Sequence, residues 1–352
     1  MKNGRSFRQR IRNRWVKLKA KLMLPMRRAD LAGALTIELT NHCTLACTCC
    51  PNGRDSSHCR PKHTLAKDSF GPLLRQIDIP FSHVFLHLHG EPLLNKDLPL
   101  MVDLLVKRGV SKFTVFSNAY RSRLDVLEKM LDKLGNSELE LCFSAEVYDK
   151  QAYERLRFPG SYETVWKSLE EADRLMAAHQ RHYSLICIID SQAVATLNKS
   201  VPEIFRHLPQ LKDIHFSSAF PWPHLPETGD IAGHLSRRRA VCSQIWQLPV
   251  ILASGEVSMC SSDYRGECIV GSLWEHTYSQ LMNNRKARLF RRHIATRRAY
   301  RNTICEACLI DRLTIFSRTV RRKFILEAKA NTLETYFANY NKYFTIDEQT
   351  TR

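Results

Sequence analysis

The sequence has 352 residues, of which 44% are hydrophobic and 9% aromatic. This is enough for one large domain and a smaller one, and it excludes a wholly disordered chain. The net charge of +18 predicts a surface that attracts anions. No apolar run is long enough to span a membrane and no signal-peptide core occurs, so we expect a cytoplasmic protein whose twelve cysteines stay reduced.

Residues 1–30 form a basic N-terminal arm whose apolar residues share one face of a helix. Such a helix can lie on an anionic membrane surface or pack on the protein's own body. The sequence favours neither, so a peripheral membrane contact through the arm stays one of two options. The apolar residues of this face are Phe7, Ile11, Trp15, Leu18 and Leu22.

From about residue 35 to 217, apolar β-rich runs alternate with amphipathic stretches such as 98–109 and 162–179, which is typical of parallel βαβ units. Six units are too few to close an eight-stranded barrel. A partial barrel and an open doubly wound sheet both fit, and both place function at the C-terminal ends of the strands. The expected strands are residues 35–39, 83–88, 112–117, 139–144, 183–189 and 213–218.

A proline-rich stretch, residues 220–230, ends this repeat and predicts a domain boundary near 225–240. Beyond it lie basic clusters, the longest at 285–301, which suit an anionic partner or a solvated surface. We therefore expect a basic arm at 1–30, an α/β domain at 31–230, a small α+β domain at 236–320 and a helical tail at 321–352.

Four cysteines crowd into eight positions just after the first expected strand. Three of them, spaced CxxxCxxC, can hold three corners of an iron–sulfur cubane and leave the fourth iron open to a cosubstrate. Zinc is the alternative, with His58 or Cys59 as its fourth ligand. The cysteines with this spacing are Cys43, Cys47 and Cys50.

The loop at 37–52 and three further strand ends resemble the radical S-adenosylmethionine (SAM) enzymes. HGEP at 89–92 is similar to their GGEP motif, whose Gly-Glu-Pro turn receives the SAM amino group. FSNA at 116–119 is similar to the segment that contacts the SAM ribose and methionine part, and FSAE at 143–146 to the Ser-Leu-Asp-Gly position. The resemblance implies a partial (β/α)6 TIM-like barrel.

The resemblance assigns the three cysteines to a 4Fe–4S cluster with an open iron. The family usually has a bulky residue just before the last cluster cysteine, whereas this chain has Cys49, so Cys49 could be a ligand in place of Cys50. Glu146, where the family commonly has Asp, is a candidate for the base on the substrate side or for a bond to a helix N-terminus. Arg157 could grip the SAM carboxylate or form a surface ion pair. The implied SAM contacts are Gly90, Glu91, Pro92, Ser117, Asn118, Ser144 and Arg157.

A second cysteine set resembles the opening of the C-terminal SPASM extension of many radical SAM enzymes, C-x(9–15)-G-x4-C followed by CxxC. The last cysteines of the full extension are missing, so the set is similar to the shorter twitch domain, which binds one auxiliary 4Fe–4S cluster. A four-cysteine zinc site is the alternative, and Cys268 is a substitute ligand. The implied ligands are Cys242, Cys260, Cys305 and Cys308.

His87 and His89 alternate with leucines at the end of the second expected strand, so they should share one face. There they could bind a metal ion, transfer a proton or simply fill space as hydrogen-bonded side chains.

The family's chemistry begins with a reduced cluster that cleaves SAM, and the resulting 5′-deoxyadenosyl radical takes a hydrogen atom from a substrate C–H bond. An auxiliary cluster then implies a net two-electron oxidation. We expect a dehydrogenase that acts on a carbohydrate, a polyol or another small, anionic molecule, with a flavodoxin- or ferredoxin-like electron donor.

Two other functions compete with this expectation. The first is a maturase that modifies a ribosomal peptide, although the stretch before the first strand is too short for a leader-binding domain. The second is a zinc-bearing nucleic-acid-binding protein, which would explain the charge but not the strand-end motifs, so nucleic acid is not the favoured partner.

Overall fold

The computed structural model describes most of the predicted barrel and much of the predicted C-terminal domain. The predicted arm, residues 1–30, and the predicted tail, residues 321–352, lie outside the described residues. Residues 194–199 and 217 are described by their backbone alone. The described residues are 34–121, 123–189, 194–217, 219, 220, 222–225, 242, 245, 249–296 and 303–308.

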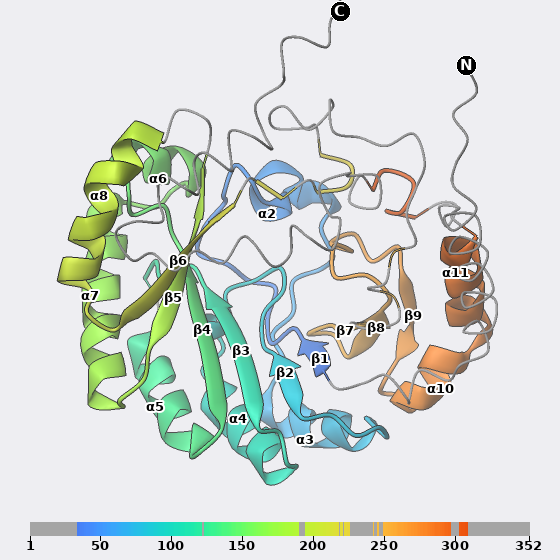
Figure 1. Ribbon diagram of the computed structural model, residues 1–352. Helices are drawn as coiled ribbons and strands as arrows, with labels where there is room; N and C mark the ends of the chain where they lie inside the picture. The colour runs from blue at the N-terminus through green and yellow to red at the C-terminus, as the bar shows by residue number, and fades with distance from the viewer. Residues whose placement is uncertain are drawn as a thin grey trace, which may run out of the picture.

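The described residues form one sheet of nine strands in the order β6-β5-β4-β3-β2-β1-β7-β8-β9. Strands β1 to β6 are parallel and follow one another across the sheet in chain order. They curve into an open barrel (Figure 1). The predicted partial (β/α)6 barrel is therefore confirmed. These strands are β1 Ala34–Ile37, β2 His83–Phe85, β3 Lys112–Ser117, β4 Glu138–Ser144, β5 Tyr183–Ile188 and β6 Leu211–Ser217.

Helices cover the outer face of the parallel strands (Figure 1). Shorter elements stand near the strand ends: α2 (Pro51–Arg54), η2 (Ser56–His58), η3 (Pro92–Leu94) and α6 (Lys150–Leu156). The covering helices are α3 Lys67–Arg75, α4 Leu98–Lys107, α5 Leu124–Leu134, α7 Tyr162–Ala178 and α8 Val194–His207.

Alternation along the strands separates a helix-covered side from the barrel interior. Val84, Phe113 and Val115 are fully buried, whereas Phe85 and Phe116, one residue away along the same strands, are only half-buried. Because successive side chains of a strand point to opposite faces, the half-buried set lines the open interior of the barrel.

The C-terminal part extends the same sheet. β7 (Val250–Ile251) pairs in parallel with β1, in the register Thr36 with Val250 and Ile37 with Ile251. β8 (Glu256–Ser258) pairs antiparallel with β7, and β9 (Ile269–Ser272) pairs antiparallel with β8. Two helices, α10 (Tyr278–Asn283) and α11 (Arg285–Ala295), flank this edge (Figure 1). The predicted small α+β domain therefore shares the sheet of the barrel, and its position is fixed through β1.

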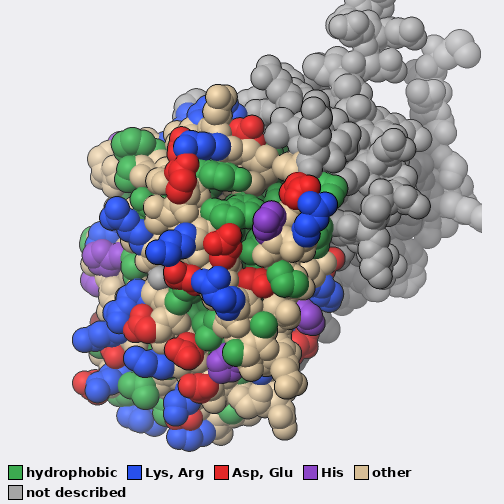
Figure 2. Space-filling model, turned by 90° about the vertical axis from the view of Figure 1, so that its left-hand side faces the viewer, with side chains coloured by type: hydrophobic (Ala, Val, Ile, Leu, Met, Phe, Trp, Pro, Cys, Tyr) green, Lys and Arg blue, Asp and Glu red, His purple; other side chains and the backbone are tan. Residues whose placement is uncertain are grey.

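Among the described residues, no helix is both long and apolar enough to cross a membrane. On the face drawn in Figure 2, Lys and Arg side chains are interspersed with Asp and Glu. The excess of positive charge is therefore not gathered into one patch on that face.

Candidate active site

The loop from Cys43 to Cys50 follows β1 and is held mainly by its backbone. The amide of Ala46 donates to the carbonyl of Phe158 at 2.6 Å, and the amide of Thr48 donates to the carbonyl of Leu156 at 2.9 Å. A β-carbon added at Gly53, in α2, would collide with the carbonyl of Cys47. The segment after α6 and helix α2 thus fix the loop from two sides.

Two side-chain donors point at the thiols of this loop. Asn118 Nδ2 donates to Cys43 Sγ at 3.4 Å, and Arg157 Nη1 donates to Cys47 Sγ at 3.9 Å. Donors of this kind stabilise thiolates and the sulfurs of an iron–sulfur cluster. The donor set of the loop therefore fits the three-cysteine cluster that the sequence implies.

Burial controls the acidity of these thiols. It raises the pKa of Cys43 to about 11 and that of Cys50 to about 12. The charges of Cys43 and Cys47 add to the increase at Cys50, so the three sulfurs lie within electrostatic reach of one another. Because thiolates are the metal ligands, binding at this site must release protons.

Cys49 contacts Cys47 through a hydrogen bond between their thiols. The hydrogen bond with Cys49 has the largest effect on the pKa of Cys47. Together with the charge of Arg157 it outweighs burial and lowers that pKa to about 7. The same bond, together with burial, raises the pKa of Cys49 well above its ordinary value. Cys49 and Cys47 are thus in direct contact, and the choice of Cys50 as the third ligand stays a prediction.

The Gly-Glu-Pro turn packs directly on the cluster loop. The amide of Glu91 donates to the carbonyl of His42 at 2.8 Å, and a β-carbon at Gly90 would collide with the carbonyl of Thr40. Glu91 is buried, and its carboxylate accepts from the amides of Leu93 at 3.1 Å and Asn118 at 2.7 Å. Burial outweighs these bonds and raises the pKa of Glu91 to about 7. The Glu91 side chain therefore joins the ends of β2 and β3.

Asn118 connects the end of β3 to the cluster loop. Its Oδ1 accepts from the amide of Tyr120 at 2.8 Å, and its Nδ2 also reaches the hydroxyl of Thr44 at 3.5 Å. Ser117 and Pro92 are also buried. Among the predicted SAM-contact residues after β2 and β3, Asn118 thus contacts the first cluster cysteine directly.

Glu146 and Arg157 are buried and bind each other. Arg157 donates through Nε and Nη2 to the two carboxylate oxygens of Glu146, both at 2.7 Å. Arg157 also donates to the hydroxyl of Ser144 at 2.9 Å, and the amide of Ile188 donates to Glu146 at 3.1 Å. Glu146 and Arg157, two separate site candidates in the sequence, form one ion pair in the structure, and this pair is buried, not at the surface as was one expectation for Arg157. The base and SAM-carboxylate roles stay predictions.

Asp263 organises the loop after β8 that carries Cys260 and Cys268. Its carboxylate accepts from the hydroxyl of Ser258 at 2.7 Å and from the amide of Cys268 at 2.8 Å, which shapes the loop between β8 and β9. Burial raises the pKa of Cys260, and the charges of Cys305 and Cys308 add to this effect.

Cys268 is placed against the predicted auxiliary ligands, because its thiol is hydrogen-bonded to that of Cys305. Cys242 is half-buried against the core. In the described part of the chain, no three His, Cys, Asp or Glu side chains are grouped to hold a single metal ion. The choice between Cys242 and Cys268 as a ligand stays open.

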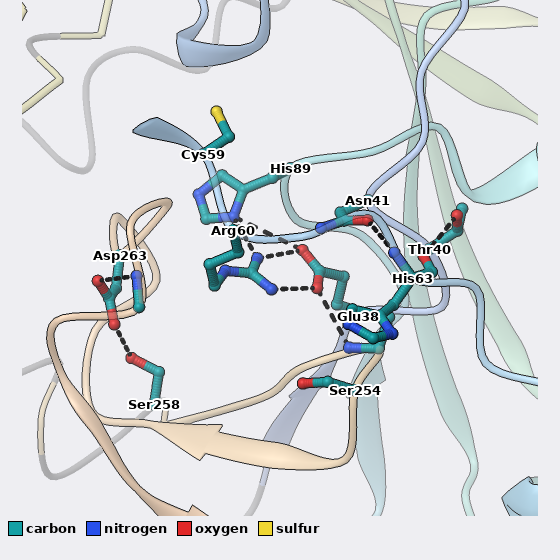
Figure 3. A network of polar contacts seen from close by, with 12 residues as sticks. Glu38, Thr40, Asn41, Cys59, Arg60, His63, His89, Ser254, Ser258 and Asp263 are labelled. Carbon is teal, nitrogen blue, oxygen red and sulfur yellow. Dashed lines mark hydrogen bonds and ion pairs between the residues drawn. The ribbon is translucent and has the colours of Figure 1, made fainter. Parts of the chain in front are cut away.

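Three buried residues that the sequence analysis did not single out as a group connect the two cysteine sites (Figure 3). Arg60 donates to both carboxylate oxygens of Glu38, at 3.0 and 2.8 Å, and lies 3.0 Å from His89 Nδ1. The amide of Ala253, just after β7, donates to Glu38 at 3.1 Å. Glu38, a charged residue in an otherwise apolar strand, was the signal in the sequence that could have revealed this network.

The network also holds the Glu38 carboxyl in its charged form. Burial alone would raise the pKa of Glu38, but the neighbouring His89 and Arg60 side chains outweigh it and lower the pKa to about 2. The backbone continues the connection, because the amide of Arg60 donates to the carbonyl of Tyr264 at 2.9 Å. The hydroxyl of Tyr264 in turn donates to Asp55 at 2.8 Å. The first cysteine loop and the auxiliary loop are thus parts of one packed unit.

His87 and His89 have different neighbours despite their spacing. The ring of His87 packs on Phe116 with centroids 4.4 Å apart, on the interior side of the barrel, and burial lowers its pKa to about 4. Its Nδ1 has no hydrogen-bond partner among the described residues. The parallel register brings Ser144, Ile186 and His215 level with one another on neighbouring strands. These side chains are half-buried, as expected for positions that face the open interior of the barrel.

Two family descriptions match the sequence. The Radical SAM superfamily matches residues 37–215, and the SPASM iron-sulfur cluster-binding domain matches residues 242–309. A comparison with curated proteins found no match.

Solved structures with a similar fold include three of the radical SAM type. Streptococcus suis SuiB bound to precursor peptide SuiA has a TM-score of 0.57 at 11% identity, over 88% of this chain and 77% of that one. Native anSMEcpe with bound AdoMet has a TM-score of 0.54 at 13% identity, over 73% of this chain and 82% of that one. BtrN in complex with AdoMet and 2-DOIA has a TM-score of 0.48 at 15% identity, over 76% of this chain and 88% of that one.

The cofactors follow from the two matched domains: SAM with a 4Fe–4S cluster in the barrel, and an additional iron–sulfur cluster in the C-terminal domain. The strand-end cysteines, the Gly-Glu-Pro turn and the parallel barrel agree with this assignment. The chain belongs to the radical SAM superfamily and carries a SPASM iron–sulfur domain at its C-terminal side.

Proposed function

We propose that the protein is a radical SAM dehydrogenase that oxidises a carbohydrate, a polyol or a related small hydroxylated molecule by two electrons. The observation that carries this proposal is the continuous sheet. β1, which leads into the first cysteine loop, pairs with β7, which leads to the auxiliary cysteines. This pairing supports an auxiliary cluster that accepts an electron close to the site of SAM cleavage.

When bound, the first cluster supplies the electron that cleaves SAM, and the auxiliary cluster supplies an acceptor for the second substrate electron. The substrate alcohol gives up the hydrogen atom of its C–H bond to the deoxyadenosyl radical. It then gives up one electron and its hydroxyl proton, which leaves a ketone or aldehyde. A flavodoxin- or ferredoxin-like donor supplies the electron that starts each cycle.

The residues of the chain serve this reaction by positioning and by handling the proton. Because the Glu91 carboxylate is occupied by the amides of Leu93 and Asn118, the SAM amino group would meet the backbone of the turn. Arg157 donates to Glu146, Ser144 and Cys47, so only one N–H group, on Nη1, would remain for SAM. His87 Nδ1, without a partner among the described residues, is our candidate for the proton acceptor.

The test uses the cluster-loaded protein with SAM, a strong reductant and ring polyols deuterated at carbon. The proposal predicts that deuterium enters 5′-deoxyadenosine and that the polyol becomes a ketone. With Cys305→Ala and Cys308→Ala combined, deuterium should still be transferred while the ketone is lost. A covalently altered peptide, with no turnover of any polyol, would contradict the proposal and favour the maturase.

A further inference from the structure

His89 places an imidazole at the position that corresponds to the first glycine of the family's GGEP motif. Nδ1 lies 3.0 Å from Arg60 Nη2 and 3.6 Å from Glu38 Oε1. Arginine only donates, so a neutral His89 must accept through Nδ1 and carry its hydrogen on Nε2. A protonated ring carries a hydrogen on both nitrogens. Nε2 is therefore an N–H donor in either state.

The Nε2–H group of His89 is buried without an acceptor. The side chain is 7% exposed, and Nε2 has no hydrogen-bond partner among the described residues. Figure 3 shows one ring nitrogen directed at Arg60 and Glu38 and the other pointing away from them. Buried polar groups are nearly always satisfied, so this donor indicates a missing partner with a lone pair.

An aromatic wall stands next to this donor. The ring centroid of Trp222 is 5.5 Å from that of His89, and Phe220 lies 4.8 Å from Trp222. Phe220 is 41% exposed, so the wall reaches the surface. A ring face is only a weak acceptor for an N–H group and does not replace a lone pair.

The wall is held in place across the open side of the barrel. Trp222 follows β6, which is one edge of the sheet, whereas His89 follows β2 and Tyr264 follows β8. The hydroxyl of Tyr264 shares its one hydrogen between Asp55 at 2.8 Å and the carbonyl of Pro223 at 3.0 Å, and the ring centroid of Tyr264 lies 6.2 Å from that of Trp222. Three distant segments thus converge where the barrel meets the SPASM domain.

The charges around the donor are already paired. Arg60 is bound by Glu38, and Arg265, on the same loop as Tyr264, is bound by Asp55 at 2.6 Å. Among the described residues, the location therefore offers an N–H donor beside flat apolar surface, with the nearby charges already paired. This combination suits an uncharged oxygen on a ring whose C–H face packs on an aromatic side chain, and it suits a phosphate or carboxylate less well.

We propose that His89, Trp222 and Phe220 form a binding subsite for a hydroxylated ring, such as a sugar or cyclitol, with His89 Nε2 donating to a ring oxygen substituent. The subsite deepens the proposed function and depends on it for the class of substrate. It assigns recognition of the substrate to the junction of the two domains.

The test compares variants of the full, cluster-loaded protein for binding of glucose, N-acetylglucosamine and myo-inositol by saturation-transfer NMR. His89→Asn keeps an amide near Nδ1 for Arg60 but loses the outward donor, whereas His89→Gln carries an amide to the position of Nε2. The matched control for Trp222→Ala is Trp166→Ala, on helix α7 outside the barrel.

We expect at least one of these probes to bind the wild type. His89→Asn and Trp222→Ala should weaken that binding about tenfold, as for one hydrogen bond or one ring contact. His89→Gln and Trp166→Ala should bind within about threefold of the wild type.

Three results would overturn the subsite: no probe binds, His89→Gln weakens binding as much as His89→Asn, or neither His89→Asn nor Trp222→Ala changes it. A capped peptide that binds through Trp222 when no ring polyol does would overturn it as well.

SAM cleavage by the wild type without any probe reports separately on the radical chemistry. If SAM is cleaved but the binding results fail, the subsite alone is wrong. If a ring polyol binds through His89 and is never oxidised, the proposed function fails while the subsite stands.

Discussion

Two buried carboxylates, Glu38 and Glu146, each accept a pair of hydrogen bonds from an arginine side chain. A charged group leaves water at a large cost unless a partner compensates it, and removing one partner leaves the other uncompensated. These pairs therefore fix the ends of β1 and β4 where the chemistry takes place. Their positions follow from single residues, and single substitutions test them.

We predict that Glu38→Gln destabilises the protein by about 3–5 kcal/mol, because it leaves the Arg60 charge buried without a counterion. The measurement is the free energy of unfolding in denaturant. The control is Glu163→Gln, which removes an exposed ion pair with Lys150 and should change stability by less than about 1 kcal/mol. Equal effects of the two substitutions would contradict a compensating role for Glu38.

The same pair predicts how stability depends on pH. The folded-state pKa of Glu38, about 2, lies below its ordinary value of 4.5. This carboxylate therefore adds about 3 kcal/mol that is fully present above pH 4.5 and is lost as the pH falls towards 2. Unfolding of the wild type and of Glu38→Gln should thus converge in acid. If the two proteins differ in unfolding free energy by the same amount from pH 6 to pH 2, the ionised Glu38 carboxylate is not the source of the stabilisation.

Among the secondary-structure elements, β2 shows how a turn overrides a strand pattern. The sequence predicted a strand over 83–88, but the strand ends at Phe85. The chain leaves the sheet because Gly90 must approach the backbone of Thr40 and Asn41, where no side chain fits. Close backbone approach at a glycine is the feature that joins the Gly-Glu-Pro turn to the cluster loop.

Gly90→Ala should therefore push the turn away from the cluster loop. We predict a loss of stability of about 1–3 kcal/mol or more from the backbone collision, together with a loss of bound iron. Gly71→Ala, in α3, is the control: its nearest neighbour is 3.9 Å away, and a helical alanine should add about 0.5–1 kcal/mol. Thermal unfolding and bound iron would be measured for both variants. A Gly90→Ala protein that is as stable as the wild type and binds the full amount of iron would contradict the close contact between the turn and the cluster loop.

Strands and helices could be predicted from the sequence where the pattern of apolar residues within the element itself determines them. The strands at 112–117 and 139–144 and the helix at 162–179 agree with the structure to within two residues, because apolar periodicity reports on them directly. β7 could not be read, since it has only two residues and exists through its pairing with β1, more than 200 positions away.

At the scale of the whole molecule, one sheet carries both cysteine sites. The strand-end cysteines, the Gly-Glu-Pro turn and Asn118 could be predicted because each belongs to a short motif that ends a strand. The contact between Glu38 and Ala253 could not, because it joins residues 215 positions apart. The aromatic wall at His89 could not be predicted from the sequence for the same reason, because its residues are far apart in the chain.

The most direct test of the account is a paired measurement of bound iron and of SAM cleavage under strong reductant. The wild type should bind about eight irons and form 5′-deoxyadenosine. The Cys305→Ala, Cys308→Ala protein should retain about four irons and still form it, whereas Cys43→Ala should not. A wild type that never cleaves SAM, or a Cys43→Ala protein that does, would contradict the account.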